Sequence, residues 1–212
     1  MDTFGILIGL GFVGGVIYNV IRIMGKKKSR RHAVMSLIAG VLLLIGAVSF
    51  FSTPLASILP KEIEWPIGYA NQIFRNSKGE IFAVDTTIQR IQTYSEEWIF
   101  LRGFSVDARG GVFKVRNEGN GRLRVFTARG NKELVYSQGG ELLETWDYRP
   151  KPYDKFPSSG RSGIVPTPLY LIPFASPFLG WLIVAVGGGI LMLLNKEEIV
   201  ERFKQGSSGG GD

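Results

Sequence analysis

The stretch Gly25-Lys26-Lys27-Lys28-Ser29-Arg30-Arg31-His32 lies between two long apolar segments, and a third apolar segment lies close to the end of the chain. A helix needs roughly 20 apolar residues to cross the hydrocarbon core of a bilayer. The pattern therefore predicts an integral membrane protein with three helical spans, at residues 4–24, 33–55 and 169–195.

The basic stretch also predicts the orientation of these spans, because short loops rich in Lys and Arg stay on the cytoplasmic side. The side chains that set the orientation are Lys26, Lys27, Lys28, Arg30 and Arg31. The N-terminus and residues 56–165 are then extracytoplasmic, and the tail 196–212 is cytoplasmic. We expect a multi-pass protein of a plasma membrane, a bacterial inner membrane, whose basic loop also attracts anionic lipid.

The first expected span is rich in small residues that could form a helix-packing face: Gly5, Gly9, Gly11, Gly14 and Gly15. Small residues four apart let two helix backbones approach closely within a membrane. The partner could be internal, since Ala39, Gly40, Gly46, Ala47 and Gly187–Gly189 are also small, or it could be another protein. The alternative is that these glycines reflect only the general abundance of glycine in membrane helices.

The net charge of +7 is distributed in a way that argues against nucleic-acid binding. Residues 1–59 hold six Lys/Arg and one Asp, whereas residues 60–163 hold sixteen basic and thirteen acidic side chains. Most of the excess therefore belongs to the orienting loop. A short loop tethered at both ends to a bilayer is a poor platform for binding phosphates.

Residues 60–147 are expected to form an all-β antiparallel extracytoplasmic domain, because short apolar runs alternate with Gly- and Asn-rich turns. The runs are Ile81–Val84, Val112–Val115, Leu123–Phe126 and Leu134–Tyr136. Laid over itself at an offset of 42 residues, Gly79–Leu101 matches Gly121–Leu143 without a gap. Such a period, with four strands per unit, is typical of a β-propeller blade.

In this region the chain resembles the repeats of NHL-type and related propellers, most clearly at Gly79–Asp85 and Arg90–Tyr94. Propellers typically have about 4–8 blades, whereas only two units fit between the second and third expected spans. The resemblance therefore implies an open, propeller-like sheet or a small two-sheet sandwich. The alternative is a generic antiparallel domain whose periodicity is coincidental.

Basic side chains gather in the second half of the β domain, and five of them are candidates for docking an acidic partner: Arg102, Arg109, Arg116, Arg122 and Arg124. The alternative is a solvated face balanced by Asp107, Glu118 and Glu133. Residues 148–168 are rich in proline and are expected to be an extended linker that leads back to the membrane.

The sequence offers little for catalysis. The chain has no cysteine, which excludes thiolate chemistry. Its one histidine, His32, lies in the basic loop at the membrane boundary, so we expect no Ser-His-Asp triad. No phosphate or dinucleotide motif is present. We expect the chain not to be an enzyme and to have no intrinsic cofactor, metal or small-molecule substrate. Bound lipids, and pigments or cofactors held by a partner, are compatible with this sequence.

These observations favour an accessory subunit or assembly factor of a larger membrane complex, of the respiratory, photosynthetic, secretion or transport kind. Its helices would pack against other integral membrane subunits, and its β domain would brace the extracytoplasmic face. The alternative is a membrane-anchored receptor or sensor whose β domain binds a ligand or protein.

Overall fold

The computed structural model describes residues 11, 14–15, 18, 29–148 and 153–196. Its chain divides into two compact units. The helical unit takes in residues up to Phe51 and from Ser176 onward, and the β unit runs from Ser52 to Ala175. Most of the first expected span, Lys26–Lys28 and the tail beyond residue 196 lie outside the described residues.

Two helices form the described part of the helical unit: α2, Arg30–Ser52, and α3, Pro177–Leu194. Both are long and apolar enough to cross a membrane, and they are the two candidates among the described residues, where the sequence predicts three. Ser29 caps α2, since its Oγ accepts a hydrogen bond from the His32 N–H at 3.3 Å. Pro177 opens α3, as proline at the first helical position commonly does.

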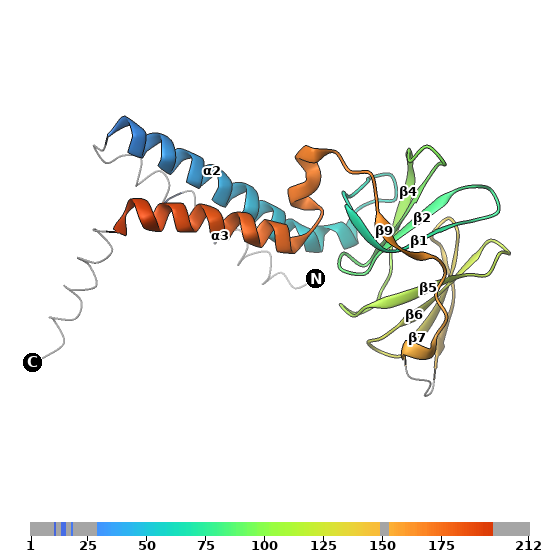
Figure 1. Ribbon diagram of the computed structural model, residues 1–212. Coiled ribbons are helices and arrows are strands. Elements are labelled where there is room, and N and C mark those ends of the chain that lie inside the picture. Colours follow the sequence, from blue (N-terminus) through green and yellow to red (C-terminus); the bar gives the residue numbers. More distant parts are fainter. Residues whose placement is uncertain (1–10, 12–13, 16–17, 19–28, 149–152, 197–212) are drawn as a thin grey trace, which may run out of the picture. The chain divides into compact units, whose positions relative to one another are not determined.

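The β unit consists of two antiparallel sheets, which confirms the predicted all-β antiparallel domain (Figure 1). Sheet A has the strand order β4-β3-β2-β1-β9: β1 Tyr69–Arg75, β2 Ile81–Asp85, β3 Arg90–Tyr94, β4 Phe100–Ser105 and β9 Arg161–Ile164. Sheet B has the order β5-β6-β7-β8: β5 Phe113–Asn117, β6 Arg122–Thr127, β7 Lys132–Ser137 and β8 Leu142–Asp147. Three short 3₁₀ helices complete the unit: η1 Thr53–Ile58, η2 Tyr153–Lys155 and η3 Leu169–Phe174.

The offset of 42 residues relates the two sheets strand by strand. Ile81 pairs with Tyr94 in sheet A as Leu123 pairs with Tyr136 in sheet B. The irregularity between Thr93 and Tyr94 returns between Val135 and Tyr136. Backbone positions with positive φ recur at the same offset: Gly68 and Gly110, Gly79 and Gly121, Gln89 and Asn131, Trp98 and Gly140. The repeat in the structure therefore extends beyond the segment that is recognisable in the sequence.

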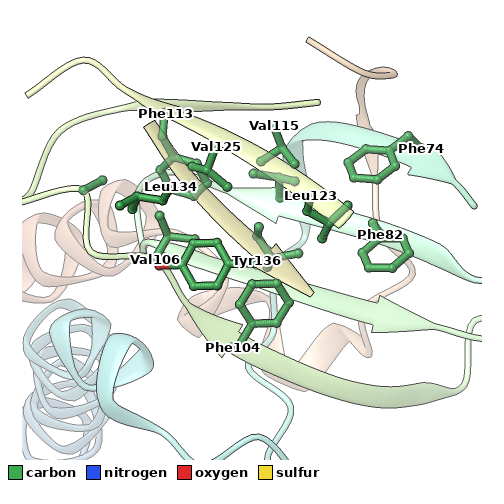
Figure 2. Packing of buried hydrophobic residues seen from close by; sticks show 13 residues of the cluster. Phe74, Phe82, Phe104, Val106, Phe113, Val115, Leu123, Val125, Leu134 and Tyr136 are labelled. Atoms are coloured by element: carbon green, nitrogen blue, oxygen red, sulfur yellow. The ribbon is translucent and has the colours of Figure 1, made fainter. Parts of the chain in front are cut away.

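The two sheets pack on a shared core (Figure 2). Phe74, Phe82 and Phe104 enter it from sheet A, and Leu123, Val125 and Tyr136 enter it from sheet B. The sheet A counterparts of the last three residues are Ile81, Ala83 and Tyr94, and these belong to a second cluster. Equivalent faces of the two sheets therefore point in the same direction. The sheets stack head to tail, as successive blades of a propeller do, and they share the core that lies between them.

Sheet A is covered on both faces, and all residues of β2 and β3 are buried. The second cluster covers the face that points away from sheet B and includes Ala56, Ile67 and Val165 from outside the strands. Residues 148–168, expected to be a linker, include β9, which pairs with β1. The sequence does not reveal this strand because it has four residues, Arg161-Ser-Gly-Ile, without a clear alternating pattern.

Candidate partner-binding surfaces

Small side chains form the contact between α2 and α3. The buried residues of α2 are Ser36, Ala39, Gly40, Gly46, Ala47 and Ser49, and those of α3 are Gly180 and Gly187. A Cβ atom at Gly46 would lie 2.6 Å from the Gly180 carbonyl oxygen, and one at Gly187 would lie 2.9 Å from the Ala39 carbonyl oxygen. The helices therefore run antiparallel and approach so closely that only glycine fits at these two positions.

Leu43 and Val184 also lie in this contact, but many large apolar side chains of both helices are exposed. Those exposed on α2 include Met35, Ile38, Val41, Ile45 and Val48, and those on α3 include Phe178, Trp181, Leu182, Val186 and Met192. A water-soluble helix pair would normally bury such side chains and expose small or polar ones. The arrangement leaves an apolar outer surface that suits lipid or other apolar helices.

The predicted packing face of the first expected span is described only in part. Gly5 and Gly9 lie outside the described residues, whereas Gly11, Gly14 and Gly15 are helical and exposed. A Cβ atom at any of these three would meet none of the described residues within 4 Å. Their role in packing against another chain stays a prediction.

The orienting loop is likewise described only at its end. Lys26, Lys27 and Lys28 lie outside the described residues, Arg30 opens α2, and Arg31 is exposed.

Three of the five arginines predicted as docking residues make ion pairs within the chain. Arg102 binds Glu80 at 3.0 Å on sheet A, and Arg122 binds Glu144 at 3.1 Å on sheet B. Arg124 binds both Glu118, at 2.6 Å, and Glu133. The hydrogen bond that Arg124 donates to the Glu118 carboxylate is the main cause that raises the pKa of Arg124. For Arg109 and Arg116, no ion pair is found among the described residues.

The ion pair of Arg124 lies on the outer face of sheet B, where the repeat would otherwise present apolar residues. At the equivalent positions of sheet A, Phe82 stands for Arg124 and Ile91 for Glu133, and both enter the shared core. Terminal units of repeat proteins need a polar outer face to stay soluble. Charged residues in place of the stacking residues therefore end the stack after two sheets.

A buried arginine that the sequence reading does not single out fixes the segment between η1 and sheet A. Arg90 on β3 is fully buried (0% exposed), and burial lowers the pKa of its guanidinium. Its Nη1 donates to the carbonyl oxygens of Ala56 (3.2 Å) and Leu59 (3.0 Å). Its Nη2 donates to those of Pro60 and Ile63, both at 2.8 Å. The charge is thus stabilised by four main-chain carbonyl groups of one short segment.

Neighbouring polar groups hold the same segment, residues 57–65, against β3 and β4. The Gln92 side chain both accepts from the Trp65 N–H (2.7 Å) and donates to the Trp65 carbonyl (2.8 Å). The Gly103 N–H on β4 donates to the Lys61 carbonyl at 2.8 Å. An alternating pattern of polar residues in a strand, Arg90-x-Gln92-x-Tyr94, is the sequence signal for this site, but exposed edge strands give the same pattern.

Strand β8 is the counterpart of β4 and forms the corresponding edge of sheet B. Its outer edge is open. Leu142, Leu143 and Trp146 are 54%, 46% and 57% exposed. By the shared register, Thr145 corresponds to Gly103, so its N–H points away from β7. Among the described residues, no main-chain hydrogen bond is found on that side of residues 142–146.

The comparisons with known proteins do not identify a function for these surfaces. No protein-family model matches the chain, and no curated protein is significantly similar to it. Within the described part of the chain, no group of three or more His, Cys, Asp or Glu side chains is arranged to hold a metal ion.

Proposed function

We propose that this chain is an accessory subunit or assembly factor of a larger membrane protein complex. In this proposal α2 and α3 cross the membrane as an antiparallel pair, and their outward apolar side chains meet lipid and the helices of other integral membrane subunits. The β unit lies on the extracytoplasmic side, as the basic loop predicts, and braces that face of the complex.

The observation that carries the proposal is the contact between α2 and α3. Its buried residues are small, such as Ala39 and Gly187, while Trp181 and other large apolar residues are exposed. In lipid this distribution is favourable, because close backbone packing holds helices together where the hydrophobic effect between them is absent. In water the same surface would exceed the apolar patch of an ordinary monomer and would cause aggregation.

The test is the size of the native particle. Membranes that carry the full chain are extracted in a mild detergent, and the particle is analysed by native size separation followed by mass spectrometry. We expect the chain in a particle well above its own 23.4 kDa plus detergent, with the same companion proteins in each preparation. A chain recovered alone would contradict the proposal and would favour the receptor or sensor alternative.

A further inference from the structure

The internal repeat shows how the outer edge of a fourth strand is used in this fold. In sheet A the segment 57–65, which contains the end of η1 and a turn at residues 61–62, lies beside β4, and the Gly103 N–H donates to the Lys61 carbonyl at 2.8 Å. Ser105 reinforces the contact through a hydrogen bond from its hydroxyl to the Ser57 carbonyl. The edge of β4 is thus covered by an irregular segment of the same chain.

The equivalent edge in sheet B has the same geometry without this cover. Thr145 takes the place of Gly103, and its N–H points outward with no main-chain partner among the described residues. Leu142, Leu143 and Trp146 flank it and are about half exposed. An open strand edge with apolar side chains readily pairs with another extended chain, so proteins normally cover it or use it.

We propose that the edge of β8 binds an extended segment of a partner protein, which adds as a further strand to sheet B and accepts a hydrogen bond from the Thr145 N–H. This inference rests on the proposed function and names the kind of contact that the partner makes. Strand addition supplies affinity through the main chain and specificity through the flanking side chains.

The charges near β8 indicate the chemistry of the segment. Residues 141–147 hold Glu141, Glu144 and Asp147 and no basic residue. Two of these carboxylates are bound by Arg122 and Lys132, which leaves the strand itself neutral to acidic. A second copy of β8 would bring a further set of carboxylates to the edge, which like-charge repulsion disfavours. We therefore infer a segment from another protein that is apolar beside Leu143 and Trp146 and carries no acidic residue.

The first arm of the test compares Thr145→Pro with Thr145→Ala in the full chain. Both variants lose the hydroxyl group, but only proline removes the N–H, and proline is tolerated in an edge strand where that N–H faces outward. After extraction in mild detergent, we expect Thr145→Pro to retain about tenfold less of the companion proteins than Thr145→Ala. Equal retention in two variants that unfold at the same temperature would overturn the inference.

The second arm uses the wild-type chain and does not depend on how the variants fold. Amide hydrogen exchange is measured by mass spectrometry on the native particle and on the chain stripped of its companions. We expect residues 141–148 to exchange at least about tenfold more slowly in the particle, whereas the Gly103 amide, already bonded within the chain, serves as the internal control and changes little.

The outcomes separate this inference from the proposed function. If the particle contains companion proteins but the amides of residues 141–148 are not protected from exchange, the inference is overturned and the proposed function still holds. Protection that comes from a dimer of this chain alone would also overturn it, because the occupant would then be a second copy. A chain with no companions at all would overturn both.

Discussion

Arg90 and Lys132 occupy equivalent positions of the two repeats and behave in opposite ways. Arg90 is buried with no ion pair to a carboxylate among the described residues, and four carbonyl groups of residues 56–63 accept its hydrogen bonds. Lys132 is partly exposed and forms a surface ion pair with Asp147. Burial of a charge is costly unless it is hydrogen-bonded, and the Nε–H of Arg90 has no partner among the described residues. The four carbonyl groups therefore compensate the buried charge only while residues 56–63 stay in place.

We expect Arg90→Lys to lower the free energy of unfolding of the β unit by about 2–4 kcal/mol, because an ammonium group cannot reach all four carbonyls of this fork-shaped site. The measurement is urea unfolding of the full chain in mild detergent, followed by tryptophan fluorescence. The matched control is Lys132→Ala, which removes a surface ion pair and should cost less than about 1 kcal/mol. Similar losses in both variants would show that the four carbonyl contacts are not what makes Arg90 important.

At the scale of elements, the sequence predicts what depends on local patterning. Apolar runs locate β2, β5, β6 and β7. The third expected span, residues 169–195, is α3 only from Pro177 onward, because Leu169–Phe174 forms the 3₁₀ helix η3. The four-residue strand β9 and the burial of Arg90 escape prediction, because both depend on partners far away in the chain. Three of the five predicted docking arginines are bound to carboxylates within the chain. Amino-acid composition alone cannot tell these three from Arg109 and Arg116.

The contact between α2 and α3 depends on glycine at particular positions rather than on glycine in general. We expect Gly46→Leu to separate the helices, since its Cβ would lie 2.6 Å from the Gly180 carbonyl oxygen. Gly189→Leu should not, because a Cβ there would meet none of the described residues within 4 Å. The measurement is cross-linking between the two helices. The chain lacks cysteine, so the substitutions Leu43→Cys on α2 and Gly188→Cys on α3 introduce a single pair of thiols, which a short bifunctional reagent can join. Gly46→Leu should reduce the cross-linked fraction at least about fivefold, by roughly the 1–3 kcal/mol that overpacking costs.

For the β unit as a whole, head-to-tail stacking raises the question of what stops further growth. A stack whose two ends are complementary would bind further copies, as heterologous contacts do. Here one end is covered by the segment that follows η1, and the other carries Arg124 and Glu133 in place of Phe82 and Ile91. Because both ends of the stack are covered in this way, two sheets form a complete unit without closing into a ring of further sheets.

This reading predicts that the polar end face keeps β units apart. The double substitution Arg124→Phe with Glu133→Ile restores the residue types of sheet A at both positions and, beside the exposed Trp146, creates a continuous apolar face. We expect this variant to form larger particles in dilute mild detergent, measured by light scattering, because exposed apolar patches of several hundred Å² drive association. The control exchanges the charges, Arg124→Glu with Glu133→Arg, and should keep the wild-type particle size. If the apolar variant also keeps that size, then the ion pair is not what ends the stack. The cover must lie instead in Phe156, which stacks on the neighbouring Phe126, and in Tyr148, which meets Phe126 edge to face.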